Sequence, residues 1–399
     1  MKALTGLLAL VTFGSASVVA CDSDRALEDG SAPSGDAGTD ATAIPADASV
    51  DAAVMDAGRD ATTDAASTCS VDGFCWTTLP PAQTLRAIWS DAEDSAWAVS
   101  SQGNVLRWDG AAWTIQWTST GALFAVWASS ATDVWVGGEQ GLFHGEGTSP
   151  ASVTWTPVPF DASIPVVDIA GSGPNDVWAI GNKYDTSTFP AQLRSLVRHF
   201  AGGVVTSEDA WTVDPISYRP GSFRKILVRA DGDTWLAGDR DGSYPTPPAY
   251  VLHRVKGEGD DVSWVEQAIP VEGNDFVTRV DGAGFVGNQL RIAGWRGKPL
   301  LASTLIGQIA GGPGTETWTE DRNPVSVDAH FAVAGTSPND VYLASAFGRF
   351  RHFDGTSWSL VRISIDGLPV VSDFRAMTLS PSGELWVVGD KMALHKKLP

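Results

Sequence analysis

The feature that most constrains this chain is an eleven-residue pattern that occurs seven times between residues 87 and 386. Each copy reads as a β-strand, a tight turn and the start of a second strand. The turns include Gly-Pro-Asn-Asp at 173–176 and Ser-Pro-Asn-Asp at 337–340, which suit type I turns. The copies lie at 87–97, 125–135, 168–178, 225–235, 281–291, 332–342 and 376–386. A repeat of this kind predicts one structural unit per copy, each stacked on its neighbours.

A second series of seven marks follows the first. In 107–113 and 352–358 an Asp-Gly pair stands between two β-type runs, which is a strong hairpin signal, and a tryptophan follows three residues after the glycine. The tryptophans expected on outer strands are Trp76, Trp113, Trp155, Trp211, Trp264, Trp318 and Trp358. Each repeat then has four strands, which is one propeller blade. The chain is predicted to form an all-β fold, a seven-bladed β-propeller.

The two series are offset in a way that predicts how the ring closes. Trp76 precedes the first window, whereas only 13 residues follow Trp386, the end of the last window. The seventh blade therefore lacks an outer strand of its own, and we expect the strand around Trp76 to supply it and hide both terminal edges. Cys69 and Cys75 lie just before this strand. We expect a disulfide between them, with two free thiols as the alternative.

The repeats resemble the WD40/YVTN/BNR-like propeller superfamily, including its envelope lipoproteins. The resemblance rests on Asp-Gly-x-x-Trp elements and on short apolar runs ending in glycine, such as Trp178-Ala179-Ile180-Gly181 and Trp386-Val387-Val388-Gly389. It covers residues 70–399 approximately and implies a fold, but no particular activity.

Residues 1–20 read as an export signal, with Lys2 followed by an apolar stretch from Leu4 to Val11. The segment ends in Val18-Val19-Ala20-Cys21, which resembles the lipobox of bacterial lipoproteins. That resemblance implies that Cys21 carries the lipid and anchors the chain to a membrane. The alternative is ordinary signal cleavage with Cys21 left as a free thiol. A cell-envelope lipoprotein is therefore expected, on the inner or the outer membrane.

Residues 21–68 contain the proposed lipidated cysteine and then a tether. From residue 22 to residue 68 there are eleven acidic residues, two arginines and no aromatic residue. Such a composition cannot bury a core, and its like charges extend the chain. We expect a disordered Asp/Ala-rich spacer here and the propeller at 69–399.

Composition and motifs exclude several function classes. The net charge of −20 argues against nucleic-acid binding, which needs clustered Lys and Arg. The sequence contains no Gly-x-Ser-x-Gly nucleophile elbow, no phosphate-binding loop and no His-Glu-x-x-His zinc motif, so we expect no cofactor.

Five histidines fall at similar positions on the third strands of different blades: His144, His199, His253, His352 and His395. Side chains on different blades cannot converge on one metal, so we expect packing roles and no metal site. His330 stands apart from this series.

Loop length points to one candidate binding region. The distance from the end of a window to the next outer tryptophan is 16 residues in blades 1 and 6, but 27 to 33 in blades 3 to 5. In blades 3 and 4 the extra chain falls largely in second-to-third-strand loops, near 182–192 and 239–248. The ligand-binding residues expected on that face are Tyr184, Tyr218, Arg219, Arg240, Tyr244, Trp295 and Arg296. Such aromatic and basic mixtures suit a glycan, a peptide or an envelope protein partner. The alternative is that long loops carry tyrosines by chance.

Three function classes stay open. A non-enzymatic binding propeller is the leading interpretation. The second is a glycoside hydrolase or lyase of sialidase-like propeller type, with acids such as Asp185, Asp239 and Asp241. The Asp box of that family is not matched, because Asp109 and Asp354 lie four residues before their tryptophans instead of five. The third is a scaffold or assembly factor of the cell envelope.

Overall fold

The computed structural model describes residues 69–398, except 93, 188, 190, 220, 241–248, 258–260, 271–276, 297–301, 310–313, 327 and 366, and except the side chains of 322–326. The chain divides into two compact units, Met1–Thr62 and Thr63–Pro399, and every described residue belongs to the second. The predictions for the export signal, Cys21 and the tether lie outside the described residues.

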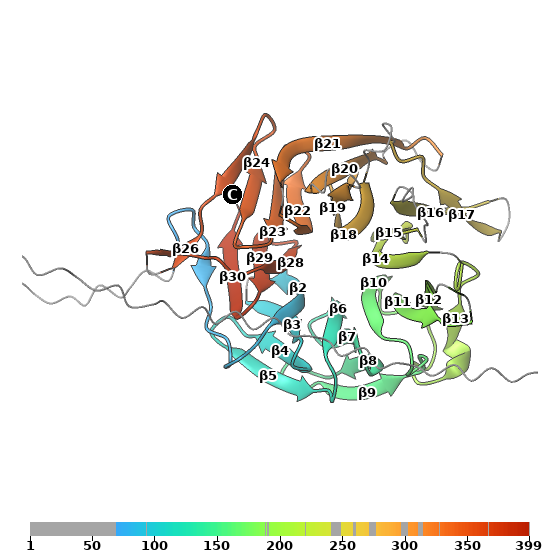
Figure 1. The fold of residues 1–399 in the computed structure, drawn as a ribbon. Coiled ribbons are helices and arrows are strands. Elements are labelled where there is room, and N and C mark those ends of the chain that lie inside the picture. The colour runs from blue at the N-terminus through green and yellow to red at the C-terminus, as the bar shows by residue number, and fades with distance from the viewer. Residues whose placement is uncertain are drawn as a thin grey trace, which may run out of the picture. The chain divides into compact units, whose positions relative to one another are not determined.

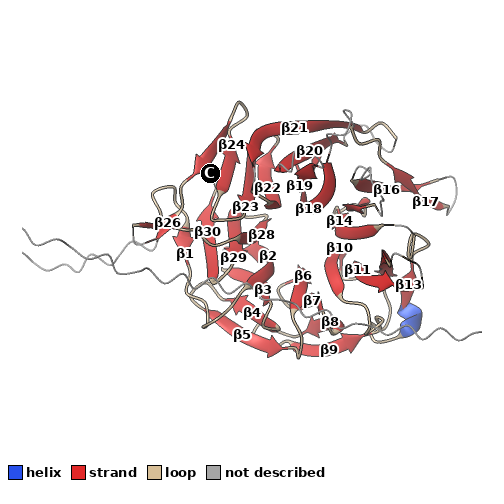
Figure 2. Cartoon of the chain, viewed as in Figure 1, coloured by secondary structure: helices blue, strands red, loops and turns tan. Residues whose placement is uncertain are grey.

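Seven four-stranded antiparallel sheets are arranged around a central axis (Figures 1 and 2). Blade 1 has β2 (Leu85–Ala92), β3 (Ser95–Ser100), β4 (Asn104–Trp108) and β5 (Trp113–Thr118). Blade 2 has β6 (Leu123–Ser130), β7 (Asp133–Gly138), β8 (Gly141–Glu146) and β9 (Thr154–Val158). Blade 3 has β10 (Val166–Gly173), β11 (Asp176–Asp185), β12 (Gln192–Phe200) and, after the 3-10 helix η1 (Glu208–Ala210), β13 (Trp211–Val213). Blade 4 has β14 (Ser222–Val228), β15 (Thr234–Asp239), β16 (Tyr250–Lys256) and β17 (Val262–Glu266).

The remaining blades complete the ring. Blade 5 has β18 (Val277–Val286), β19 (Gln289–Arg296), β20 (Ala302–Gln308) and β21 (Thr317–Ser326). Blade 6 has β22 (His330–Ser337), β23 (Asp340–Ser345), β24 (Phe350–Phe353) and β25 (Trp358–Val361), followed by a hairpin of β26 (Ser364–Ile365) and β27 (Leu368–Pro369). Blade 7 has β28 (Phe374–Leu379), β29 (Glu384–Gly389), β30 (Met392–Lys397) and β1 (Cys75–Trp76). The prediction of an all-β, seven-bladed propeller is confirmed. No described helix has the length and hydropathy to cross a membrane.

The blades pack in sequence around the axis. The inner strands contact one another in the order β2, β6, β10, β14, β18, β22 and β28, and β28 contacts β2 again. Buried clusters join neighbouring blades, as where Trp386 of blade 7 lies 5.5 Å from Trp113 of blade 1 between ring centroids. Because a single sheet cannot bury both of its faces, this packing between blades supplies the core of the domain.

The seven outer tryptophans all lie on fourth strands, as predicted. Four of their indole N–H groups reach back to the blade before. Trp113 donates to Thr77 Oγ1 (2.9 Å) and Trp264 to Asp214 Oδ1 (2.9 Å). Trp318 donates to Gln267 Oε1 (3.1 Å) and Trp358 to Asp321 Oδ2 (3.0 Å). The tryptophan repeated in the sequence therefore joins successive blades at the rim.

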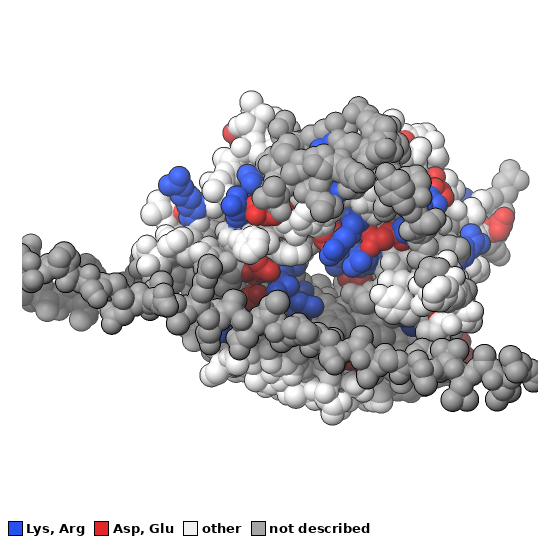
Figure 3. Space-filling model, viewed as in Figure 1, with Lys and Arg blue, Asp and Glu red and all other residues white. Residues whose placement is uncertain are grey.

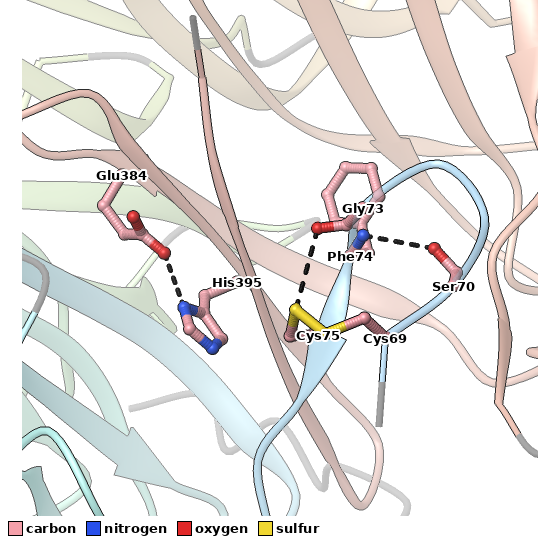
Figure 4. Close-up of a disulfide and its surroundings, with 7 residues drawn as sticks. All are labelled: Cys69, Ser70, Gly73, Phe74, Cys75, Glu384 and His395. Atoms are coloured by element: carbon pink, nitrogen blue, oxygen red, sulfur yellow. Dashed lines mark hydrogen bonds and ion pairs between the residues drawn. A yellow bond between two sulfur atoms is a disulfide. The ribbon is translucent and has the colours of Figure 1, made fainter. Parts of the chain in front are cut away.

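The ring closes as the offset predicted. β1 pairs with β30, with Cys75 opposite His395 and Trp76 opposite Leu394. Phe74 is fully buried and its ring lies 5.1 Å from that of Phe350 in blade 6. In the structure Cys69 and Cys75 form a disulfide, with an S–S distance of 2.04 Å, at the start of the closing segment (Figure 4).

The five third-strand histidines occupy the positions predicted for them. Each pairs across the ladder with the aromatic residue that ends its window, and its ring lies 3.9–4.8 Å from that aromatic ring. A ring nitrogen also lies 2.5–2.7 Å from the acid two residues before the aromatic. The pairs are His144–Asp133, His199–Asp176, His253–Asp233, His352–Asp340 and His395–Glu384. Within the described ranges no group of three or more His, Cys, Asp or Glu side chains is placed to hold a metal.

Candidate functional site

Every inner strand carries a β-bulge near its start, at the same place in the repeat. The bulged residue has no partner in the ladder, so the regular alternation of side-chain directions along the strand is interrupted there. The seven bulged residues are Arg86, Phe124, Val167, Arg224, Asp281, Phe331 and Arg375. All seven line a pocket of about 410 Å³ that also borders the inner strands. The bulges therefore build a ring of side chains around the central channel.

The local sequence explains the bulges. A buried residue precedes each bulge, and the residue facing it on the second strand is glycine in five blades and serine in the other two. A Cβ atom on Gly238 would lie 2.0 Å from the carbonyl oxygen of Ser222, and one on Gly389 would lie 1.9 Å from that of Asp373. In the five blades with glycine, the glycine that ends the apolar run thus leaves room for the bulged backbone to approach closely.

Charged side chains gather around the channel mouth, as Figure 3 shows for this face. Its lining includes five cations, Arg86, Arg224, Lys225, Arg279 and Arg375. Four of them form ion pairs: Arg224 with Asp239, Lys225 with Asp168 (3.5 Å), Arg279 with Asp281 (2.8 Å) and Arg375 with Asp390 (2.5 Å). Each of these four carboxylates at the mouth is therefore paired with a cation.

Burial shifts the pKa values of several charged groups that line the channel. Burial raises the pKa of Asp168, and the Lys225 ammonium opposes that rise. Burial likewise raises the pKa of Asp281, opposed by Arg279. The pKa of Arg86 is lowered, first by burial and then by the neighbouring positive charge of Arg375.

A second pocket, of about 470 Å³, lies on blade 3. It is lined by Lys183, Tyr184, Asp185, Thr186, Ser187, Arg194 and Tyr218. β11 and β12 stay paired as far as Asp185 opposite Gln192, so the loop expected over 182–192 is shortened to 186–191. Tyr184 is 68% exposed and Tyr218 47% exposed, and the Lys183 Nζ lies 5.7 Å from the Tyr218 ring centroid. Two aromatic rings and three charged groups thus border one pocket.

Tyr218 is held in a strained conformation. Its φ is +62°, and its backbone N–H donates to the Ser195 carbonyl (2.7 Å). Two residues earlier, Ile216 is buried and its N–H donates to Asp214 Oδ1 (2.9 Å). Positive φ in a non-glycine residue costs energy and persists where the surroundings impose it, often at binding sites.

The chain direction places both pockets at one end of the ring. Each inner strand starts at the end where the chain enters from the preceding blade, and the turns between second and third strands lie at that same end. All four described non-glycine residues with positive φ are in such connections or turns: Ala82, Tyr218, Phe347 and Lys391. We call this end of the ring the entry face.

The structure brings some of the predicted site residues together and separates others. Tyr184 and Tyr218 share the blade-3 pocket, and Arg219 follows Tyr218 with its side chain exposed. Arg240 instead pairs with Glu266 and its guanidinium lies 4.4 Å from the Tyr250 ring centroid in blade 4.

Blade 5 contributes little to that pocket. Trp295 is half-buried on β19, and Arg296 is buried in an ion pair with Glu320 (3.1 Å), so its charge does not face solvent. Tyr244 lies outside the described residues, as does Asp241.

The two described acids considered for catalysis both have partners. Asp185 accepts hydrogen bonds from the hydroxyl (2.5 Å) and the N–H (3.0 Å) of Ser187, which lower its pKa. Asp239 pairs with Arg224 and accepts the N–H of Val280 (2.8 Å).

The ring of bulged residues around the central channel was not predicted from the sequence, although the sequence contains a signal for it. In six blades the bulged residue stands immediately before the eleven-residue window, as Arg86 does before 87–97. In blade 5 it is Asp281, the first residue of the window. The window marks the strand, but the bulge that turns the preceding side chain inward depends on pairing with the second strand.

No family model matches the sequence, and no curated protein matches it. Solved structures do match the fold. YCF48 bound to D1 peptide has a TM-score of 0.55 at 16% identity, covering 85% of this chain and 100% of that one. The extracellular domain of BT4673 from B. thetaiotaomicron has a TM-score of 0.57 at 12% identity, covering 82% of this chain and 40% of that one.

A WD40 structure matches equally well. The WD40 repeats of RRP9 have a TM-score of 0.55 at 10% identity, covering 84% of this chain and 100% of that one. At such identities the likeness concerns the fold alone. The chain is a seven-bladed β-propeller with the fold of the WD40 and YCF48 propellers.

Proposed function

We propose that this chain is an exported binding module, anchored at the cell envelope through Cys21, which presents the entry face of its propeller to a peptide or protein partner. The observation that carries the proposal is the blade-3 pocket, where Tyr184 and Tyr218 are exposed beside Lys183, Asp185 and Arg194. Exposed aromatic rings flanked by charges of both signs are typical of protein recognition sites.

The strain at Tyr218 supports the same assignment. A tyrosine at positive φ presents its ring at an angle that the relaxed backbone would not give. Its hydrogen bond to Ser195 holds that angle before any ligand arrives. Preorganisation of this kind lowers the entropy that a partner must overcome on binding.

One structural neighbour, YCF48, is bound to a peptide, which agrees with a peptide partner. The BT4673 domain is extracellular, which agrees with export. A scaffold for envelope proteins would use the same face. A hydrolase is less well supported, because Asp185 and Asp239 are engaged by Ser187 and Arg224.

Arrays of peptides and of glycans, probed with the purified full chain, test the proposal. We expect peptides to be retained, and retention to fall at least about tenfold in the Tyr184→Ala/Tyr218→Ala double variant. Val265→Ala, an exposed substitution on β17, is the matched control and should change nothing. Retention of glycans alone would assign the pocket to sugars, and retention that is equal in the double variant would refute the assignment of this pocket.

A further inference from the structure

Arg86 is the one cation of the channel lining that forms no ion pair with a described acid, although the charge of Asp390 acts on it from a distance. It is the bulged residue of β2, half-buried, and borders the central pocket. Among the described residues it makes no ion pair and no hydrogen bond. Its guanidinium carbon lies 5.9 Å from the ring centroid of Phe124, the bulged residue of blade 2. The guanidinium of Arg86 thus borders the pocket with its hydrogen-bonding capacity unused by the described residues, and a ligand with acceptor oxygens could take it up.

The acids nearest to Arg86 are already committed to Arg375. Asp390 places one oxygen 2.5 Å from Nε and the other 3.0 Å from Nη2 of Arg375. Asp373 uses one oxygen on Arg375 (3.4 Å) and the other on the N–H of Phe347 (2.9 Å). Neither acid therefore forms an ion pair with Arg86, whose side chain lines the central pocket.

We propose that Arg86 binds a carboxylate group that the partner inserts into the channel mouth. Guanidinium and carboxylate match in a planar, two-bond geometry. The pocket of about 410 Å³ has room for the C-terminal carboxylate of a peptide, and Phe124 and Phe331 also line it and supply apolar contacts.

The surrounding charges select for a singly charged ligand. Asp168, Asp239, Asp281 and Asp390 all lie at or next to the mouth in ion pairs. Like charges would repel a doubly charged phosphate more strongly than a carboxylate. The residues of this site are separate from the blade-3 pocket, but a peptide as its occupant rests on the proposed function.

The test compares each array peptide with a free C-terminal carboxylate and with an amidated one, in binding to the full chain. N-acetylglycine, whose amine is capped and whose carboxylate is free, is the small-acid probe. We expect free-acid peptides to bind at least about tenfold more tightly than their amides. Arg86→Gln should remove that difference. Arg229→Gln, at the opposite end of the ring, also loses an arginine beside a phenylalanine ring and should preserve the difference.

The outcomes separate this inference from the proposed function. Equal binding of acids and amides, or full retention of the difference in Arg86→Gln, would overturn the carboxylate site while leaving peptide binding intact. Binding of N-acetylglycine that requires Arg86, without any peptide binding, would support the site and assign it to free small acids. If neither probe binds, both proposals are wrong. The unfolding temperature of Arg86→Gln and of Arg229→Gln is compared with that of the parent. An unchanged temperature excludes misfolding as the cause of a change in binding.

Discussion

Trp76 lies opposite Leu394, so the first and last strands of the described chain pair in one blade. Deleting residues 69–76 removes that pairing and the fully buried Phe74, and exposes the edge of β30. We expect the free energy of unfolding to fall by at least about 3 kcal/mol, because burial of one phenylalanine contributes that much. The exposed edge should also promote self-association. Chemical denaturation and size-exclusion chromatography measure the two effects.

The matched control keeps the strand and removes only the disulfide. Cys69→Ser with Cys75→Ser releases a short loop, for which the loss should be about 2 kcal/mol with no self-association. If the deletion behaved like this double variant, β1 would not be what closes the ring.

His253 links two blades through two carboxylates. Its Nε2 lies 2.6 Å from Asp233 and its Nδ1 2.6 Å from Glu316, whose side chain is 3% exposed. His253→Ala would leave the buried Glu316 carboxylate with the N–H of Gly314 but without the histidine, so we expect the free energy of unfolding, measured by urea denaturation, to fall by about 3–5 kcal/mol. His352 has one carboxylate partner and is more exposed. His352→Ala should therefore cost less, about 1–2 kcal/mol, and a loss as large as that of His253→Ala would contradict this difference.

His330 occupies a position that is apolar in the other six blades. Its counterparts are Leu85, Leu123, Val166, Phe223, Val280 and Phe374. Burial, with a further contribution from Arg351, lowers the pKa of His330 to about 4. Between pH 6.5 and 4 the unfolded chain binds the proton and the folded chain does not. The contribution of neutral His330 to the free energy of unfolding is therefore fully present above pH 6.5. It decreases by about 3 kcal/mol as the pH drops to 4.

Replacing the pair of His330 and Ser345 tests this origin. His330→Leu with Ser345→Gly reproduces the Leu123–Gly138 pair of blade 2 and removes the titrating group. The decrease in the free energy of unfolding from pH 6.5 to pH 4 should be smaller than in the parent by about 3 kcal/mol. An unchanged pH profile would show that other groups cause the acid sensitivity.

The architecture could be predicted because each blade repeats two aromatic marks at a nearly constant spacing. The Trp386 window and the Trp76 strand even predicted the closing pair, since a missing outer strand has one available donor. The ring of bulged residues was not predicted. Arg86 and Arg375 stand immediately before their windows, but only pairing with β3 and β29 forces them out of the ladder.

The candidate site was only partly predictable for a related reason. Tyr184 and Tyr218 were expected on one face from loop length, and the structure places them at one pocket. Arg296 seemed equivalent by composition, but its burial against Glu320 depends on packing within blade 5 that loop length does not reveal.

The membrane anchor has its own test. If Cys21 is acylated, the full chain should partition with membranes and Cys21→Ser should move to the soluble fraction. Mass spectrometry of the N-terminal peptide should show the added acyl chains only in the parent. Membrane partition that Cys21→Ser does not change would contradict lipid anchoring through this residue.

Hydrogen–deuterium exchange of the full chain, with and without the peptide retained most strongly on the array, tests the binding face most directly. We predict slower exchange at residues 183–187 and 214–219, and unchanged exchange in the first-to-second-strand turns such as 337–340 at the opposite end. Protection confined to those turns would show that the partner binds the other end of the ring.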